Sequence, residues 1–77
     1  TLVGGSGNDR LTAGTGASTL YGGAGNDTYT GSEFNDYLYD ADASGDDSIN
    51  ALGGNDLVYG GAGADTVNAG DGNDQVY

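Results

Sequence analysis

Aspartate is the residue type in this chain whose number and spacing could do chemistry. Twelve of the 77 residues are acidic and one, Arg10, is basic, so the net charge is −11. Most of the aspartates recur at the sixth place of a nine-residue pattern, G-G-x-G-x-D-x-U-x, in which U is a large apolar residue. Carboxylates at a constant spacing are oxygen donors for a hard divalent cation, and calcium accepts many such donors at once.

The nine-residue pattern accounts for the whole chain. Residues 4–12, 22–30 and 60–68 match it in full, and residues 69–77 lack only the first glycine. Looser copies cover residues 13–21, 31–39, 42–50 and 51–59, with Asp40–Ala41 as a two-residue insertion, and residues 1–3 are the end of a further copy. The U position never holds a polar residue; its occupants are Leu2, Leu11, Leu20, Tyr29, Leu38, Ile49, Val58, Val67 and Val76.

Two consecutive repeats should form one coil of the fold. A strand of three residues cannot bury an apolar face alone, so the copies must stack. Alternate repeats share their ninth residue: it is Tyr21, Tyr39, Tyr59 and Tyr77 in one set and Thr12, Thr30, Asn50 and Asn68 in the other. We therefore expect an all-β fold, a right-handed parallel β-roll (β-solenoid) with two nonapeptides per coil and about four coils. The insertion should bulge from one turn without disturbing the ladder of strands.

In such a roll the sixth positions form two columns of side chains. The first column is Asp9, Asp27, Asp47 and Asp65, and the second is Ser18, Asp36, Asp56 and Asp74. Carboxylates about 5 Å apart repel by roughly 1 kcal/mol in water and by more where water is thinned. A cation between successive aspartates replaces this repulsion with attraction. An irregular site made of many oxygens suits Ca²⁺ better than Mg²⁺. About five ions would nearly balance the net charge.

The composition argues against several other functions. Cysteine and histidine are absent, so disulfide bonds are impossible and zinc and copper lack their usual ligands. With no His, Cys or Lys to activate a nucleophile, we do not expect an enzyme. Nucleic acid and anionic membrane surfaces need positive charge, and no apolar run is long enough to insert into a membrane.

The nonapeptide resembles the repeat of the RTX (repeats-in-toxin) family of secreted bacterial proteins, the hemolysin-type calcium-binding repeat, over all 77 residues. The resemblance implies a parallel β-roll that binds Ca²⁺ between consecutive coils, leaves the cell unfolded by type I secretion and folds outside. It also implies that the aspartates of both columns bind the ions together with carbonyls of the turns. Those carbonyls belong to Gly4, Gly5, Gly7, Gly22, Gly23, Gly25, Gly60, Gly61, Gly63, Gly70 and Gly72.

Departures from the repeat set the expected number of ions. Ser18 stands in place of an aspartate, which weakens the site that it would share with Asp36. Phe34 stands in place of the glycine at the fourth position of the repeat, at a cost of about 1–2 kcal/mol if that position needs a positive φ. We expect about five Ca²⁺ ions, or six if Ser18 and Asp36 also share one. Asparagine at the fifth position is expected as a turn residue that tolerates left-handed backbone; it occurs as Asn8, Asn26, Asn35, Asn55 and Asn73.

These observations predict a calcium-binding module that folds on Ca²⁺ binding after secretion and assists the folding of an attached protein. We expect residues 1–77 to be a single block and a fragment of a larger secreted protein, whose flanking domains are its partners. Terminal coils without caps could also associate end to end.

Three alternatives remain open at this stage. The strip formed by Tyr21, Tyr39, Tyr59 and Tyr77, joined by Tyr37 and Leu57, could stack across strands or could bind a glycan or protein partner. The small polar residues of the other face could order water as an ice-binding surface does, although Arg10 interrupts them. Residues 40–45 match the first half of an EF-hand loop, but Ala51 stands where its glutamate would be.

Overall fold

The computed structural model describes residues 1–40 and 45–77, and over these residues it consists of short parallel strands joined by turns. Most strands are three residues long and centred on a U position, because a polar, apolar, polar triplet favours a strand with one buried side. The strands are β1 (Leu2–Ser6), β2 (Arg10–Thr12), β3 (Thr19–Ala24), β4 (Thr28–Thr30), β5 (Tyr37–Tyr39), β6 (Ser48–Asn50), β7 (Leu57–Tyr59), β8 (Thr66–Asn68) and β9 (Gln75–Val76).

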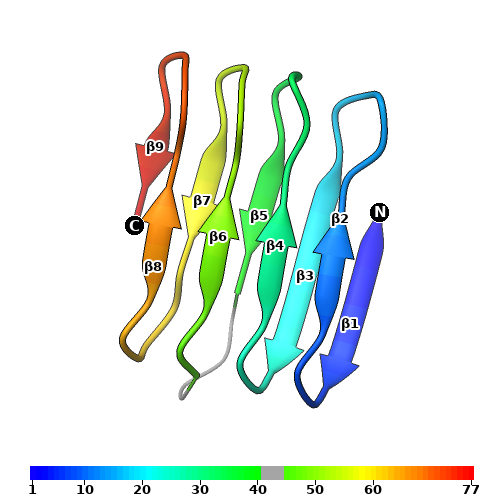
Figure 1. Ribbon diagram of the computed structural model, residues 1–77, viewed down its shortest axis with the longest axis vertical. Helices are drawn as coiled ribbons and strands as arrows, with labels where there is room; N and C mark the ends of the chain where they lie inside the picture. Colours follow the sequence, from blue (N-terminus) through cyan, green and yellow to red (C-terminus); the bar gives the residue numbers. More distant parts are fainter. Residues whose placement is uncertain (41–44) are drawn as a thin grey trace.

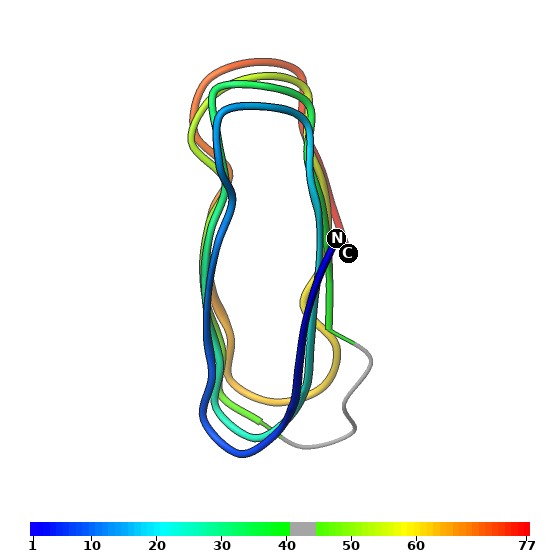
Figure 2. The ribbon, with the colours of Figure 1, turned by 90° about the vertical axis from the view of Figure 1, so that its right-hand side faces the viewer.

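The strands form two parallel sheets, which confirms the predicted β-roll. Sheet A has the order β1-β3-β5-β7-β9, and sheet B has the order β2-β4-β6-β8. Consecutive strands therefore lie in opposite sheets and run in opposite directions (Figure 1). Seen along the axis of the roll, the coils superimpose as one flattened ring (Figure 2). Two repeats make one coil, and there are about four coils.

The register follows the period of the sequence. Leu2 pairs with Leu20 and Leu20 with Leu38, each 18 residues apart, whereas Leu38 pairs with Val58 across a step of 20. The same longer step joins β4 to β6 in sheet B. The two additional residues therefore leave both ladders intact, as the sequence predicts.

Asp40, which the sequence analysis placed in the insertion, keeps the hydrogen-bond pattern of the repeat. The backbone N–H of Asp40 donates to the carbonyl of Tyr59 at 2.8 Å, just as Gly60 in the next coil donates to Tyr77 at 3.0 Å. Asp40 thus occupies the place of the first glycine of a repeat, and its assignment to the Asp40–Ala41 insertion is wrong. Ala41 and most of the EF-hand-like segment, residues 41–44, lie outside the described residues.

A single column of apolar side chains fills the space between the sheets. The U residues of the inner coils, Leu11, Leu20, Tyr29, Leu38, Ile49 and Val58, are all buried, and Ala13 and Ala51 pack with them. Leu2 and Val76, on the terminal coils, are exposed because a neighbouring coil covers only one side. This core is thin: the molecule measures 28 × 20 × 13 Å. Burial of apolar surface alone is therefore a weak source of stability at this size.

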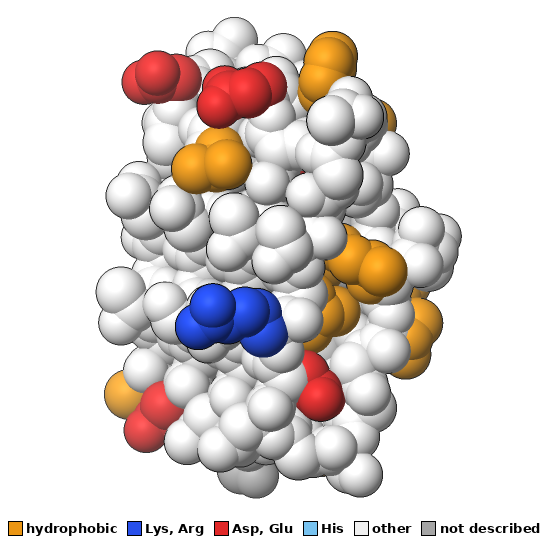
Figure 3. Space-filling model, turned by 45° about the vertical axis from the view of Figure 1, so that its right-hand side comes forward, with side chains coloured by type: hydrophobic (Ala, Val, Ile, Leu, Met, Phe, Trp, Pro, Cys, Tyr) orange, Lys and Arg blue, Asp and Glu red, His pale blue; other side chains and the backbone are white. Residues whose placement is uncertain are grey.

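The roll also buries acidic side chains, which is rare in soluble domains. Asp27, Asp36, Asp40, Asp47 and Asp56 are all at most 3 % exposed. On the face that Figure 3 shows, most atoms accordingly belong to neither an acidic nor a basic side chain. The charge that the composition records is thus held largely inside the turns, where carboxylates need a partner.

The outer face of sheet A carries a tyrosine strip, here Tyr21, Tyr37, Tyr39, Tyr59 and Tyr77. Neighbouring rings contact one another with centroids 4.8–6.5 Å apart. Such distances are those of stacked and edge-to-face aromatic pairs, which stabilise adjacent strands. On sheet B the pairing aligns Thr28, Ser48 and Thr66 in one polar row, and Arg10 pairs with Thr28 at its end.

The turns stack so closely that glycine is required at particular places. Gly25 has a φ of 117°, and a Cβ there would overlap the carbonyl oxygen of Gly7 in the preceding coil. Phe34 occupies the equivalent position but is not in the left-handed region; among the described non-glycine residues, the one with positive φ is Leu52, at 73°. The penalty considered for Phe34 therefore does not arise, and the strained backbone lies at Leu52 instead.

Gly25→Ala should destabilise the folded roll by about 2 kcal/mol or more, because the added methyl meets both an unfavourable φ and the Gly7 carbonyl. Gly14→Ala is the matched control: nothing lies within 4 Å of its Cβ position, and its φ is not left-handed. Urea unfolding in saturating calcium, followed by circular dichroism, measures both. Equal midpoints for the two variants would contradict the close stacking of the turns.

Candidate metal sites in the turns

The seven predicted aspartates lie at equivalent places, each directly before a strand. Asp9, Asp27, Asp47 and Asp65 precede β2, β4, β6 and β8, and Asp36, Asp56 and Asp74 precede β5, β7 and β9. Because the coils are in register, each aspartate lies next to its counterpart one coil away. The structure thus brings together the two columns that the repeat predicts.

One oxygen of six of the seven carboxylates links the coils, and Asp9 takes part through its backbone N–H. The backbone N–H of Asp9 donates to Oδ1 of Asp27 at 2.9 Å, that of Asp27 to Asp47 at 2.8 Å and that of Asp47 to Asp65 at 3.0 Å. The second column repeats this geometry from Ser18 to Asp36 (2.9 Å), Asp36 to Asp56 (2.8 Å) and Asp56 to Asp74 (2.8 Å). These bonds to charged acceptors hold each carboxylate in the turn of its neighbour.

The second oxygen is where a metal ion would bind. Oδ2 of Asp9, Asp47 and Asp56 is buried and accepts no hydrogen bond from the described residues. A buried carboxylate oxygen without a donor is costly, whereas a bound cation would compensate it. Gly4 keeps space beside Asp9, since a Cβ on Gly4 would lie 2.6 Å from that Oδ2. The residues present therefore fit a hard cation with oxygen ligands.

Asp36 differs from the other members of its column. Its Oδ2 accepts the backbone N–H of Ser32 at 2.6 Å, and the Ser32 hydroxyl lies 3.0 Å from both carboxylate oxygens. The same hydroxyl accepts the backbone N–H of Phe34 at 3.1 Å. Ser32 thus satisfies the second oxygen with protein donors in the turn that lacks the usual glycines. Sequence analysis missed Ser32 because its role depends on the folded turn.

The asparagines at the fifth position have a different role from the one predicted. Oδ1 of Asn8 accepts the backbone N–H of Asn26 at 2.9 Å, and Asn35 and Asn55 bond in the same way to the next coil at 2.7 and 2.9 Å. None of these residues has a positive φ. Their amides form a ladder between coils. Tolerance of left-handed backbone, the predicted reason for asparagine at this position, is therefore wrong.

Asp40 is a further buried acid, which sequence analysis placed in the insertion and the EF-hand-like segment and not in either aspartate column. One carboxylate oxygen from each of Asp27, Asp40 and Asp47 lies within 4.8 Å of the other two. The hydroxyl of Tyr29 donates to Oδ2 of Asp40 at 2.8 Å. Burial raises the pKa of Tyr29 above its ordinary value, and the bond to Asp40 raises it further, so the hydroxyl remains a donor.

The electrostatics of the turns oppose full ionisation. Burial raises the pKa of Asp47, the neighbouring Asp40 and Asp65 add to the rise, and the hydrogen bond from the Asp27 backbone opposes it, so that the pKa lies at about 6. Burial likewise raises the pKa of Asp56, and Asp36 and Asp74 add to this effect. The charged forms of these groups therefore lack sufficient compensation from the protein alone.

Fold and turn chemistry together define a calcium-binding β-roll. A family model described as the RTX calcium-binding nonapeptide repeat (4 copies) matches residues 3–38 and 43–76, which is most of the chain. The chain therefore belongs to the RTX calcium-binding nonapeptide repeat family, whose repeat is a structural calcium-binding unit and not a catalytic one. Comparison with curated proteins and comparison with solved structures gave no match. Across the described ranges, no helix is long and apolar enough to cross a membrane.

Without calcium, the roll should be more stable at pH 5 than at pH 7.5. The folded-state pKa of Asp47, about 6, is raised above its ordinary value of 3.8, so its contribution is fully present below about pH 4 and is lost as the pH rises through 6. The strand signal that calcium-depleted protein retains in circular dichroism, compared between pH 5 and pH 7.5, measures this dependence. Asp47→Asn should flatten it, and metal-free stability that increases with pH would contradict it.

Proposed function

We propose that the chain is a calcium-dependent folding module of a secreted protein. In this proposal the aspartates of the two columns bind Ca²⁺ between consecutive coils, together with carbonyls of the glycine turns. Metal binding and folding are then one process, because an unfolded turn forms no site and a metal-free roll must bury uncompensated charge. Family membership supports calcium as the ion.

The observation that carries the proposal is the buried carboxylate oxygen without a donor, found at Asp9, Asp47 and Asp56. The protein cannot compensate these charges itself, since Arg10 is the single basic side chain and lies on the exposed start of β2. A divalent ion shared by two successive aspartates supplies the missing charge and the missing coordination at the same time.

The arrangement supports about five ions. Three would lie between successive members of the first column and two between Asp36, Asp56 and Asp74. A sixth, between Ser18 and Asp36, is disfavoured because Ser18 brings no charge and Ser32 already occupies the second oxygen of Asp36. The total charge of five ions, about +10, would offset most of the net charge of −11.

The proposed mechanism uses the difference in calcium between compartments. Where calcium is scarce, repulsion in the columns keeps the chain unfolded and suited to type I secretion. Where calcium is plentiful, outside the cell, the roll forms and assists the folding of the flanking domains. The terminal strands β1 and β9 of sheet A each have one unpaired edge, so the module can also stack end to end.

Replacement of Asp56 by Asn tests the columns. Asp56 would bind two ions, one shared with Asp36 and one shared with Asp74, so we expect the stoichiometry measured by calorimetry to fall by one or two ions. Asp71→Asn is the control, since Asp71 is exposed and outside both columns.

Wild-type protein should gain its strand signal in circular dichroism with millimolar Ca²⁺ and lose it with a chelator. An equal strand signal in both conditions would contradict the proposal.

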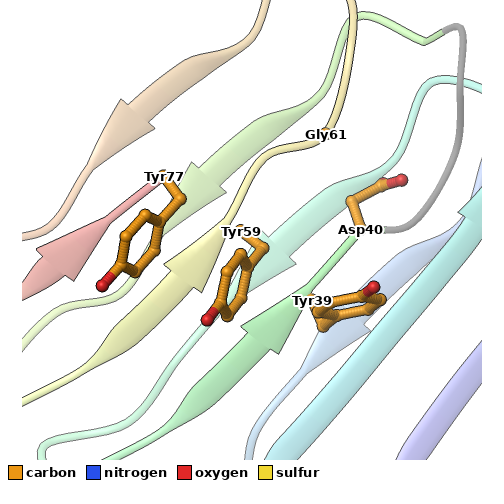
Figure 4. A pocket seen from close by; sticks show the side chains of 5 residues that line it. All are labelled: Tyr39, Asp40, Tyr59, Gly61 and Tyr77. Atoms are coloured by element: carbon orange, nitrogen blue, oxygen red, sulfur yellow. The ribbon is translucent and has the colours of Figure 1, made fainter.

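A second candidate function is binding of a glycan or partner by the tyrosine strip. A hollow of about 330 Å³ lies against it, lined by Tyr39, Asp40, Tyr59, Gly61 and Tyr77. Figure 4 shows the three tyrosine rings side by side along this surface, one from each of three successive coils of sheet A. Aromatic faces in a shallow hollow suit the apolar side of a sugar ring.

Tyr39→Ser with Tyr59→Ser separates the two functions. We expect the double variant still to fold with calcium, with stability lowered by about 1–3 kcal/mol through loss of ring contacts. Thermal melts in calcium measure folding, and a soluble glycan array measures binding. If the variant loses a glycan that the wild type binds while its calcium response is unchanged, the strip is a binding surface; if wild type binds none, its role is cross-strand stacking.

A further inference from the structure

One turn of the roll contains a third buried carboxylate. Asp40 follows β5 directly; the equivalent residues are Gly22, within β3, and Gly60, directly after β7. The equivalent positions of the neighbouring coils thus carry no side chain, whereas this one carries an acid that is 2 % exposed. In Figure 4 the Asp40 side chain points away from the tyrosine rings of the outer face.

The Asp40 carboxylate meets the first column of aspartates. One oxygen each of Asp27, Asp40 and Asp47 lies within 4.8 Å of the others, and all three residues are buried. Three carboxylate oxygens this close together can share one cation. A site made of several carboxylates suits Ca²⁺, which accepts many oxygen ligands, better than Mg²⁺, which usually keeps several of its waters.

A second observation points independently to a ligand. Asp47 is 3 % exposed, its Oδ1 accepts the backbone N–H of Asp27, and its Oδ2 is buried without a hydrogen bond from the described residues. This oxygen lies beside two other carboxylates, which repel it when all three are charged. A cation would satisfy it.

The core itself holds Asp40 in place. Tyr29 is the one aromatic residue at a U position, and its hydroxyl reaches from the core to donate to Oδ2 of Asp40. Gly22 in the preceding coil makes room for this hydroxyl, because a Cβ on Gly22 would overlap it. A buried donor that orients a ligand carboxylate usually raises metal affinity. Tyr29 and Asp40 thus act as a pair that the other coils lack.

We propose that Asp27, Asp40 and Asp47 form a three-carboxylate calcium site, positioned by Tyr29, that binds calcium more tightly than the two-carboxylate sites of the same chain. The inference rests on the proposed function, since Asp27 and Asp47 already share an ion there, and adds a ligand from outside the columns. Affinity in oxygen-ligand sites rises with the number of charged ligands. This site therefore fills with calcium first and joins the coil that contains β4 to the coil that contains β6.

Calcium titration of the full chain against a chromophoric chelator tests the site. Asp40→Asn keeps an oxygen for the Tyr29 hydroxyl but removes the charge. Asp40→Gly introduces the residue found at the equivalent positions, Gly22 and Gly60. Both should weaken binding of the first ion by about tenfold or more, and Tyr29→Phe should weaken it less. Asp71→Asn, which removes an exposed acid, should leave it unchanged. All four variants should reach the folded state at saturating calcium.

Each other outcome has a distinct meaning. First-ion affinity that is equal in wild type, Asp40→Asn and Asp40→Gly would overturn the three-carboxylate site while leaving the column sites standing. Failure of both Asp40 variants to fold at saturating calcium would also overturn it, because Asp40 would then support the fold instead of the ion. A wild-type chain that binds no calcium would refute the proposed function itself.

Discussion

The structure depends on one constraint, the stacking of carboxylates in register inside the turns. Each coil places an aspartate under the aspartate of the next, and the backbone N–H of one residue bonds to a single carboxylate oxygen of the other. This geometry fixes the distance between coils and leaves the second oxygen of Asp9, Asp47 and Asp56 without a donor from the described residues. Hydrogen bonding and electrostatic repulsion therefore act on the same pair of groups in opposite directions.

The remaining features of the repeat follow from this constraint. The glycines allow successive turns to lie in contact, so that Gly25 passes over the Gly7 carbonyl without a side chain. The apolar U residues form a core only one side chain thick, which is a weak source of stability at this size. The tyrosine strip and the asparagine ladder add contacts between neighbouring coils. All of these contacts are between adjacent coils, as in other solenoids, and a bound ion acts at the same interface.

The sequence predicted the structural features that depend on the period of the repeat. A repeat of nine residues with a period of 18 in the tyrosines was enough to specify two sheets, the register of Leu20 on Leu38, and the two aspartate columns. It failed where a residue departs from the repeat. Asp40 looked like part of an insertion because it is not glycine, yet its backbone keeps the ladder bond that Gly60 keeps. Ser32 and Tyr29 acquire their roles only through contacts across the folded turn, which no spacing along the chain reveals.

The central claim is that divalent ions lie between the stacked aspartates. Anomalous diffraction from crystals grown with calcium tests it most directly, because it locates each ion without reference to the protein. The account predicts anomalous peaks between Asp9 and Asp27, between Asp47 and Asp65 and between Asp56 and Asp74, each within about 2.3–2.6 Å of carboxylate oxygens from two coils. Peaks confined to exposed acids such as Glu33 and Asp71, with none between the coils, would contradict it.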